Sequence, residues 1–419
     1  MTIQFYSCLF AVSIMRGSVL FCVFGLWLLQ SNLMAQETST VVPASQPDCI
    51  RIATFNVSLH RTRAGELVEN LTAGDTQAAK IARIIQMTSP DILLVNEIDF
   101  DEDGKAAKLF LEKYLQVPQT SDQDTSRFLK HYFTSSVNTG KPSGLDLNNN
   151  GKLGEPDDCW GFGLYPGQYG MAVYSRFPIA TDEVRTFQNF LWRDMPGALM
   201  PVNPADQTPF YSPEVWNKFP LSSKSHWDVP IKTDGGIVHV LASHPTPPVF
   251  DGKEDRNGCR NHDEIRFWKD YISGEDSGSY MSDDKGKRGG LSAKASFVVL
   301  GDLNSDPFDG AGRSDAIKSL LNSKRITSSP NPKSEGGVLA GKEQGKANDQ
   351  HKGPAENDTA DFGDGTAGNL RCDFAIPSQN FEIVQSGVFW PTPDQMTEAE
   401  QLISASDHRL VWIDVRIRN

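Results

Sequence analysis

Two short polar motifs carry residue types that hydrolysis requires. GDLNSDPFDG contains Asp302 and Asn304 directly after an apolar run. Asp302 offers an anionic oxygen, and Asn304 offers both a donor and an acceptor. In SDH, Ser406 to His408, Asp407 could ligate a hard cation while the neighbouring imidazole orients or deprotonates water. A helix cap followed by a surface histidine would give the same tripeptide, so SDH alone does not decide between the two.

Polar side chains of similar kinds end other apolar runs of the chain. Asn56 ends RIATFN, Glu97 ends DILLVNE and His244 ends HVLASH. Each of them alone could be a turn former or a helix cap. Open sheets place their sites at the carboxyl ends of strands, so these residues together with Asp302 and Asn304 predict one shared site at a sheet edge.

The elements that must position these residues are short apolar strands with amphipathic helices between them. Runs rich in Val, Ile and Leu are typical of strands buried on both faces. A helix is expected at each stretch with core-facing residues at helical spacing. Together these elements predict an α/β or α+β domain with more than one sheet. The predicted strands cover 52–57, 92–95, 171–174, 238–242, 297–300 and 411–417, and the predicted helices cover 80–87, the segment around Phe110, Leu111 and Tyr114, and 261–273.

Two regions are poor in such signals. Residues 196–230 are punctuated by prolines, the last of them Pro230, and are predicted to form a long ordered loop over one face. Residues 328–369 consist mostly of Gly, Ser, Asn, Lys and Asp. They are predicted to be a mobile loop or insertion, and not a domain boundary, because strand-like sequence resumes at Arg371.

The N-terminal segment up to Ala35 has the pattern of a secretory signal. Arg16 precedes an apolar run over 19–29, which is shorter than the ~20 residues that span a bilayer. An uncleaved N-terminal anchor is the alternative. The mature protein is therefore expected to be secreted or periplasmic.

Charge and cysteine content narrow the classes of partner and site. The formal net charge of −13 argues against tight binding of DNA, because Lys and Arg on phosphates supply most of that affinity.

Four cysteines follow the signal, and in an exported chain they predict two disulfides in any of three pairings. They have no CxxC spacing, which argues against zinc. These cysteines are Cys49, Cys159, Cys259 and Cys372.

A second metal motif lies apart from the hydrolytic one. DLNNNGKLGEPD, residues 146–157, has the spacing of a calcium loop, with Gly151 at the tight turn and Leu153 at the apolar eighth position. An Asn/Gly-rich loop without an ion is the alternative, because an Asp replaces the usual closing Glu and flanking helices are not evident. A bound Ca²⁺ would have a structural role. The predicted calcium ligands are Asp146, Asn148, Asn150 and Asp157.

Seven motifs in order resemble the endonuclease/exonuclease/phosphatase superfamily: RIATFN, DILLVNEID, GMAVYSR, VLASHPTPP, VVLGDLNSDP, LRCDFAIPS and SDHRLVWIDV. They run from about Arg51 to Val415. The resemblance implies an α+β fold, a four-layer α/β/β/α sandwich of two mixed β-sheets flanked by helices. The expected organisation is a signal peptide at 1–35, a tail at 36–48 and one domain over 49–419, with loop insertions at about 140–168, 190–230 and 328–369.

The resemblance also implies how the motif residues handle metal and water. Glu97 matches the main metal-ligating acid, supported by Asn56 and Asp407, and the expected ion is Mg²⁺ or Mn²⁺. Asp302 matches the residue that orients or activates the attacking water. Asn304 matches the neighbour that stabilises the transferring phosphoryl oxygens.

Histidine and arginine side chains complete the implied site. His244 matches a histidine that hydrogen-bonds the phosphate, and Asp373 matches the carboxylate that pairs with His408. Either Asp302 or His408 could be the base. Several basic residues beside the motif-bearing loops could contact the substrate phosphate, and ordinary solvated charge is the alternative for each. They are Arg193 and Arg260, with Arg176, Arg256 and His262 as further candidates.

The function that the resemblance implies is an exported, divalent-metal-dependent phosphoester hydrolase of the phosphodiesterase or nuclease type. The expected partner is a phosphoester substrate, with nucleic acid among the candidates, and the protein is expected to be a monomer without a stable protein partner. A sphingomyelinase-like or phosphomonoesterase activity is the alternative within the enzymes. A calcium-stabilised binding protein that kept the fold without catalysis is the alternative from another class.

Overall fold

The computed structural model describes residues 41–120, 127–274, 276–328 and 331–418. The predicted signal peptide at 1–35 lies outside these residues. Contacts gather the described residues into one unit. No helix within the described ranges is long and apolar enough to cross a membrane.

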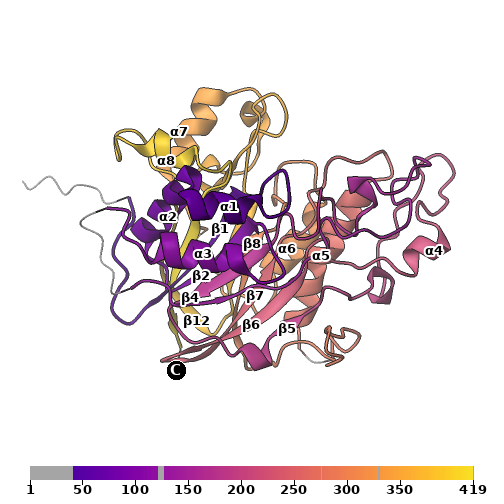
Figure 1. The fold of residues 1–419 in the computed structure, drawn as a ribbon, viewed down its shortest axis with the longest axis horizontal. Helices are drawn as coiled ribbons and strands as arrows, with labels where there is room; N and C mark the ends of the chain where they lie inside the picture. Colours follow the sequence, from indigo (N-terminus) through magenta and orange to yellow (C-terminus); the bar gives the residue numbers. More distant parts are fainter. Residues whose placement is uncertain (1–40, 121–126, 275, 329–330, 419) are drawn as a thin grey trace, which may run out of the picture. The chain divides into compact units, whose positions relative to one another are not determined.

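Two β-sheets form the frame of this unit (Figure 1). Strands run parallel in the pairs β1·β2 and β7·β8 and antiparallel in every other pair of the two sheets, so both sheets are mixed. The first sheet has the order β12-β13-β1-β2-β4-β3, with β1 Ile50–Leu59, β2 Ile92–Ile98, β3 His131–Phe133, β4 Met171–Ser175, β12 Phe381–Val388 and β13 Val411–Ile417. The second has the order β11-β8-β7-β6-β5, with β5 Arg185–Thr186, β6 His226–Thr233, β7 Gly236–Ser243, β8 Ser296–Asp302 and β11 Asp373–Pro377.

Alternation along the strands creates three apolar cores and hence four layers. In β1, Phe55 packs under the helices while Ile52 packs between the sheets, because successive side chains point to opposite faces. Val299 of β8 faces a third core on the outer side of the second sheet. The predicted α/β/β/α sandwich is therefore confirmed. The first sheet is covered by α1 (Glu66–Ala73), α2 (Thr76–Thr88) and α3 (Lys105–Phe110), and the second by α5 (Arg256–Ile272) and α6 (Ser314–Leu321).

Every predicted strand lies inside an observed one. The first predicted helix falls in α2, and the second falls in α3 and the π-helical turn Leu111–Leu115 that follows it. The start predicted for the third helix is wrong. This helix, α5, begins at Arg256, five residues before Asn261. Asn261 does not cap it, because its amide donates to the carbonyl oxygens of Thr246 (2.8 Å) and Leu303 (3.0 Å).

The two regions whose sequences lack strand and helix patterns, 196–230 and 328–369, also differ from their predictions. Pro230 lies inside β6 and not in a loop. Its carbonyl oxygen lies on the side away from β7 and accepts from Ala180 N at 2.9 Å, beyond the end of β5. The N–H that proline lacks would lie on the same side, so no hydrogen bond between β6 and β7 is lost. The segment 328–369 was predicted to be a mobile loop or insertion. It contains α7 (Glu335–Gln344) and β9 (Ala360–Asp361), and β10 (Asn369–Leu370), which pairs with β9, begins at its end, so it is not a loop without secondary structure; its being an insertion stays a prediction.

Glycine explains how α7 packs without burying a large apolar side chain. A Cβ at Gly336 would lie 2.2 Å from the carbonyl oxygen of Trp390, so the helix backbone contacts its neighbour directly. Ser334 begins the helix by accepting from Gly337 N at 3.1 Å. Backbone contact therefore replaces the apolar stripe on which sequence patterns depend.

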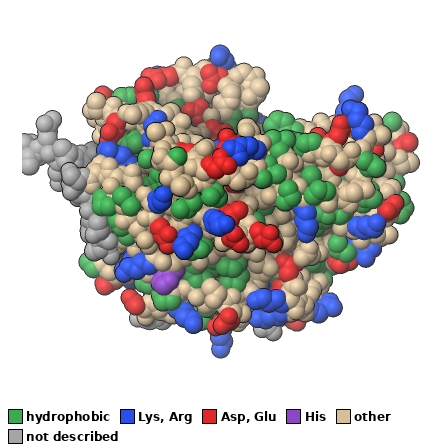
Figure 2. Space-filling view, in the orientation of Figure 1, with side chains coloured by type: hydrophobic (Ala, Val, Ile, Leu, Met, Phe, Trp, Pro, Cys, Tyr) green, Lys and Arg blue, Asp and Glu red, His purple; other side chains and the backbone are tan. Residues whose placement is uncertain are grey.

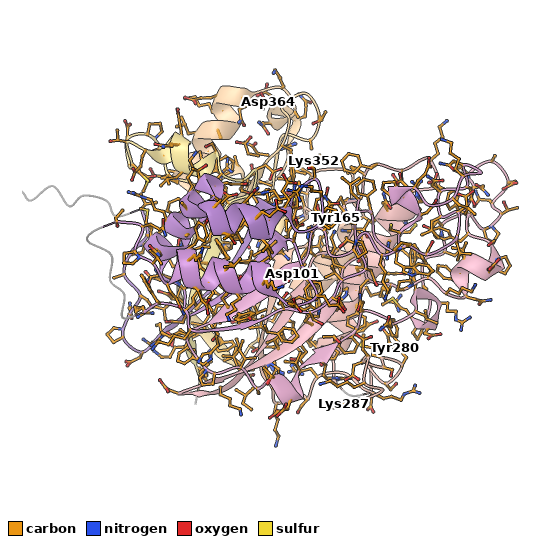
Figure 3. The ribbon with its side chains drawn as sticks, viewed as in Figure 1. Asp101, Tyr165, Tyr280, Lys287, Lys352 and Asp364 are labelled. Atoms are coloured by element: carbon orange, nitrogen blue, oxygen red, sulfur yellow. The ribbon has the colours of Figure 1, made fainter. Side chains whose placement is uncertain are left out.

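The segment at about 140–168, which was predicted to be a loop insertion, is hydrogen-bonded to residues at the ends of β1 and β2. The hydroxyl of Tyr165, labelled in Figure 3, lies 2.6 Å from Asp99 Oδ2 and 2.9 Å from the carbonyl oxygen of Arg61. Gln168 donates to the same carbonyl oxygen at 2.7 Å. This loop is thus held beside the edge of the sheet that carries Glu97.

The four cysteines of the described residues are free thiols, so the prediction of two disulfides is wrong. They lie on separate parts of the fold. Cys49 precedes β1, Cys159 follows a turn in the first insertion, Cys259 lies in α5 and Cys372 precedes β11. Burial raises the pKa of the Cys259 thiol to about 11, which keeps that thiol protonated at neutral pH.

Acidic and basic side chains are interspersed over the face shown in Figure 2, and on this face they do not gather into one basic stripe. The electrostatic footprint of a duplex-binding protein is a clustered basic surface. The distribution agrees with the net charge of −13 in disfavouring a long polyanion as the partner of this face.

Candidate active site

Strand alternation brings the motif residues to one edge of the space between the sheets. Ile52 and Leu300 fill the core between the sheets. Asn56 lies four residues after Ile52 and Asp302 two after Leu300, so their side chains point the same way. His244 follows Ala242 of the same core by the same spacing. Strand alternation alone therefore places these polar side chains on the face of each sheet that faces the other sheet.

Close packing of the two sheets joins the ends of β2, β7 and β8. A Cβ at Gly301 would lie 2.0 Å from the carbonyl oxygen of Ser243, so only glycine allows β8 to come this near the end of β7. Asn96 of β2 bridges the sheets by donating to that carbonyl oxygen (3.3 Å) and accepting from Asp302 N (3.2 Å). These contacts fix Asp302 relative to both sheets.

Asp302 lies at the centre of the site. Its Oδ2 accepts from Asn56 Nδ2 at 3.1 Å and faces Nε2 of His244 at 3.4 Å and Nε2 of His408 at 3.6 Å. Its Oδ1 accepts from Asn304 N at 2.9 Å. Burial opposes ionisation, but the charges of His408 and His244 outweigh it and hold the pKa of Asp302 well below its usual range. Asp302 is therefore an ionised acceptor within the site.

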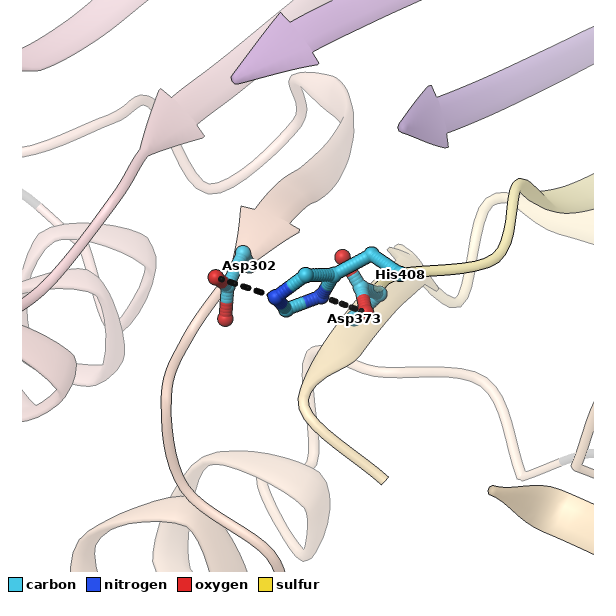
Figure 4. A group of neighbouring side chains, drawn as sticks. All are labelled: Asp302, Asp373 and His408. Carbon is cyan, nitrogen blue, oxygen red and sulfur yellow. Dashed lines mark hydrogen bonds and ion pairs between the residues drawn. The ribbon is translucent and has the colours of Figure 1, made fainter. Parts of the chain in front are cut away.

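His408 lies between two carboxylates (Figure 4). Its Nδ1 is 2.8 Å from Asp373 Oδ2, while its Nε2 faces Asp302. Asp302 and Asp373 are direct neighbours across the β8·β11 ladder. Thr359 donates its hydroxyl to Asp373 Oδ2 at 2.9 Å, which holds the carboxylate in place. The carboxylate of Asp373 in turn orients the imidazole so that Nε2 points into the site.

Opposing effects set the protonation of this pair. Burial lowers the pKa of His408, but the charges of Asp373 and Asp302 outweigh burial and raise it to about 10. Burial raises the pKa of Asp373 to about 6, against the opposing charge of His408. His408 thus holds a proton at neutral pH and can donate it in a hydrogen bond.

The oxygen-rich side of the site lies beside Asp302. Asn56 Nδ2 donates to Glu97 Oε1 at 3.1 Å, and Ser58 links Asn56 to Asp407 by donating from its N to Asn56 Oδ1 (3.2 Å) and from its hydroxyl to Asp407 Oδ1 (3.0 Å). Glu97 and Ser58 have φ of +60° and +48°, values that non-glycine residues adopt mainly at strained sites. Carboxylate and amide oxygens of this kind fit a hard divalent cation.

Asp302, Asp373 and His408 also have one ligating atom each within 4.8 Å of one another. Their facing atoms, however, are already paired in the chain from Asp373 through His408 to Asp302. The oxygens of Glu97, Asn56 and Asp407, which the family resemblance implies as metal ligands, also have hydrogen-bond partners, but they offer the oxygen ligands that Mg²⁺ or Mn²⁺ prefers.

His60 and Tyr169 adjoin this acidic side and were not predicted from the sequence. His60 Nε2 lies 3.6 Å from Glu97 Oε2, and its ring packs against Tyr169 at a centroid distance of 4.6 Å. Burial raises the pKa of Tyr169. Tyr169 has φ of +57° and lies two residues before β4 begins at Met171. The only sequence signal was this position next to a predicted strand.

Lys224 is a further residue that sequence patterns did not reveal. Its side chain is buried, and its ammonium forms no hydrogen bond or ion pair with any residue that the structure describes. Burial lowers its pKa, against the charges of Glu264, Glu97 and Asp302. A buried cation near the acids and without its own partner is available to an anionic ligand.

The turn that carries Lys224 is held by its neighbours. Nδ1 of His226 lies 2.5 Å from Ser222 Oγ, and its Nε2 lies 2.8 Å from the carbonyl oxygen of Glu264. The Glu264 carboxylate accepts from Ser223 N and from Thr246 N, both at 2.6 Å. Lys224 is thus presented by a turn fastened to α5.

His226 gives this turn a testable pH dependence. Burial lowers its pKa from 6.5 to about 4. Because the folded value lies below the unfolded one, the contribution to stability is full above pH 6.5 and is lost as the pH falls toward 4. Between pH 7 and pH 4, the wild type should lose about 3 kcal/mol more unfolding free energy than His226→Gln. Urea titrations at both pH values measure this, and equal losses in the two proteins would contradict it.

The basic residues predicted to contact phosphate are engaged elsewhere. Arg260 is buried and donates from Nε and Nη2 to the carbonyl oxygens of Leu221 (2.8 Å), Trp160 (2.7 Å) and Pro220 (3.0 Å). Arg193 is exposed and donates to Asn217 Oδ1 at 2.5 Å. Phosphate contact by these two stays a prediction. The three further candidates also have acidic partners, Arg176 with Asp91, Arg256 with Glu254 and His262 with Asp263.

The proposed calcium loop folds into turns around its first acid. Asp146 accepts from Asn150 N (3.2 Å) and Gly151 N (2.8 Å), and Asn148 Oδ1 accepts from Asn150 N at 3.1 Å. Asp157 lies in the short 3₁₀ turn that ends the loop. Calcium binding here stays a prediction.

The test of calcium binding is metal content. Wild type dialysed against Ca²⁺ and then against buffer should retain about one ion per chain, as in calcium loops of this spacing. Asp146→Ala should retain none, while Asp206→Ala, a matched change in another exposed turn, should behave as wild type. Equal calcium in all three proteins would reject the loop as the site.

The comparison with known families agrees with this geometry. The sequence model described as "Endonuclease/Exonuclease/phosphatase family" matches residues 53–408. The chain belongs to this family. The matched segment contains Asn56, Glu97, His244, Asp302 and His408, so the site described above lies within the endonuclease/exonuclease/phosphatase region. No curated protein matches the sequence.

Solved structures similar to the chain include an endonuclease/exonuclease/phosphatase from Beutenbergia cavernae DSM 12333, with 17% identity, a TM-score of 0.48 and coverage of 89% of this chain and 72% of that one. Sphingomyelinase C from Streptomyces griseocarneus has 13% identity, a TM-score of 0.45 and coverage of 88% and 99%. The human Nocturnin catalytic domain with bound sulfate anion has 13% identity, a TM-score of 0.42 and coverage of 89% and 96%.

Proposed function

We propose that this family member is an exported, divalent-metal-dependent phosphoester hydrolase of the phosphodiesterase or nuclease type, in which an activated water attacks phosphorus. The observation that carries the proposal is the array centred on Asp302, whose carboxylate meets the amide of Asn56 and the imidazoles of His244 and His408. Export is supported by the signal pattern at 1–35.

The residues of the site divide the work of hydrolysis. Asp302 accepts hydrogen bonds only, which suits it to take a proton from the attacking water. His408, oriented by Asp373, donates toward the charge that develops on the phosphoryl group, and His244 and Asn304 lie on either side of Asp302 to orient that group.

The metal supplies neutralisation of charge on the phosphoryl oxygens when it is bound. Glu97, Asn56 and Asp407 are the residues that would hold Mg²⁺ or Mn²⁺. The remaining ligands of such ions are commonly water, so this small set of protein oxygens suffices.

A substrate panel tests the proposal. Purified protein is assayed on an aryl phosphodiester, an aryl phosphomonoester, plasmid DNA and sphingomyelin vesicles, each with Mg²⁺, with Mn²⁺ and with chelator. We expect hydrolysis of at least the aryl phosphodiester that chelator abolishes and added metal restores. No turnover on any substrate would reject the enzyme and favour a binding protein that kept the fold.

A further inference from the structure

A cavity of about 590 Å³ adjoins the catalytic residues. Sites for small ligands have roughly 300–1,000 Å³. Glu97 and His244 line one part of it, which makes it continuous with the site described above. Most of the rest of its wall comes from the segments at about 140–168 and 190–230, from the loop before α5 and from the first turns of α5, with Phe162, Phe219 and Phe250 among its residues.

The catalytic end of the cavity is prepared for an anion. Lys224 and His244 both line it, and only 6% and 3% of their surfaces are exposed. The Lys224 ammonium has no partner among the described residues. His244 Nδ1 also lacks a hydrogen bond within the described part of the chain, while its Nε2 faces Asp302. A buried polar atom without a partner, such as His244 Nδ1, is costly, and a phosphate oxygen would satisfy it while pairing with the Lys224 ammonium.

The outer end of the cavity is aromatic. Tyr211 and Phe219 are buried in its wall, with ring centroids 5.0 Å apart. Phe162 and Phe250 also line it, yet 52% and 87% of their surfaces are exposed. Phe250 has φ of +65°, a conformation unfavourable for a bulky residue. An exposed aromatic side chain held in such a conformation beside a catalytic cavity is suited to contact a ligand.

Charged groups of both signs line the cavity. Lys224, Arg256 and Arg260 lie in its wall together with Glu97 and Asp157. Arg256 is paired with Glu254, and the Arg260 guanidinium lies over the Phe219 ring at 4.6 Å. A duplex does not fit inside a cavity of this size. The class that fits its size and its aromatic wall is a small ester whose organic group is planar or apolar.

From the cavity we infer, on the basis of the proposed function, that the substrate is a small phosphate ester of an aryl or nucleoside-sized group, with Lys224 and His244 at the phosphate and the phenylalanines around the organic group. The water oxygen bonds to phosphorus, and the bond from phosphorus to the ester oxygen breaks. One water proton passes through Asp302 to the ester oxygen, which leaves as a phenol from an aryl ester or as an alcohol from a nucleoside ester, and the other stays on the phosphate.

Substrate selectivity tests this inference. The kcat/KM for bis(p-nitrophenyl) phosphate is compared with that for methyl p-nitrophenyl phosphate, in which a methyl group replaces one aryl group. Phe162→Ala and Phe250→Ala should each reduce the preference for the diaryl ester roughly tenfold. Phe308→Ala is the matched control, because Phe308 is 54% exposed and lies outside the cavity wall. Equal selectivity in all four proteins would overturn the inference.

The phosphate end is tested by Lys224→Met, which keeps the length of the side chain and removes its charge. We expect kcat/KM to fall roughly a hundredfold for both aryl esters. Arg418→Met, a surface change, is the control. Far-ultraviolet circular dichroism and the midpoint of urea unfolding verify that the folds are intact. An unchanged kcat/KM in a folded Lys224→Met protein would remove Lys224 from the site.

A binding measurement separates this inference from the proposed function. Mono-p-nitrophenyl phenylphosphonate, a diaryl ester analogue, is titrated into Asp302→Asn in a calorimeter with Mg²⁺. If Phe162→Ala weakens this binding and wild type hydrolyses no ester, the cavity is a ligand site but the protein is not the proposed enzyme. If wild type hydrolyses plasmid DNA or sphingomyelin vesicles with a higher kcat/KM than the aryl diester, and Phe162→Ala does not change that value, the protein is an enzyme but the inferred substrate class is wrong.

Discussion

Asp302→Asn should lower kcat for an aryl phosphodiester by about 10³-fold, within the range of ~10²–10⁴ that a positioned acid or base contributes. The change keeps the shape of the side chain but removes its charge and basicity. The contacts of Oδ2 with Asn56 and the two histidines require an acceptor there, so the variant also disturbs their orientation.

Stability must be measured beside the rate, because Asp302 is buried. Asp101→Asn is a suitable control, since Asp101, labelled in Figure 3, accepts from the N–H groups of Lys105 and Ala106 at the start of α3 and has no contact with Asp302 among the described residues. We expect wild-type rates in that control. A rate close to wild type in a folded Asp302→Asn protein would remove Asp302 from catalysis.

His408→Ala should lower kcat by about 10²–10⁴-fold, because it removes the group that donates toward the reacting phosphate. Asp373→Asn should lower it less, by about 10–100-fold, because Asp373 acts by orienting the imidazole. Since the two residues act as a unit through the 2.8 Å contact, the double variant should be no slower than His408→Ala alone.

His239 provides the matched control for this cycle. Its Nδ1 lies 2.7 Å from Asp228 Oδ1, so it forms a similar pair in the second sheet. This pair joins β7 to β6 within the strands, whereas Asp302 ends β8. His239→Ala should keep the wild-type kcat. Multiplicative losses in the His408→Ala, Asp373→Asn double variant would show that the two residues do not act together.

The sequence predicts the strands and their polar ends well because both depend on local alternation. Ile52 to Asn56 and Leu300 to Asp302 keep one face of a strand, so the sheet edge collects their side chains without a long-range signal. The pairing of His408 with Asp373 came from the family resemblance, since no local pattern relates residues 35 positions apart. The structure adds its reason, which is the register of Asp373 opposite Asp302.

Features that depend on tertiary contacts were not predictable in this way. Lys224 looks like any solvated lysine in SSKSH, and its burial arises from contacts of that turn with α5. Asn261 looks like a helix cap, but Thr246 and Leu303 bind its amide. Pro230 is accommodated in a strand only because its neighbour β5 is short. In each case, the deciding partner is distant in sequence.

The most direct test of the central claim is hydrolysis of bis(p-nitrophenyl) phosphate in ¹⁸O-enriched water with Mg²⁺. Attack of activated water on phosphorus predicts one ¹⁸O atom in the p-nitrophenyl phosphate product and none in the p-nitrophenol, with product formation stopped by chelator and by Asp302→Asn. Label in the p-nitrophenol, or hydrolysis that persists in chelator or in Asp302→Asn, would contradict the account.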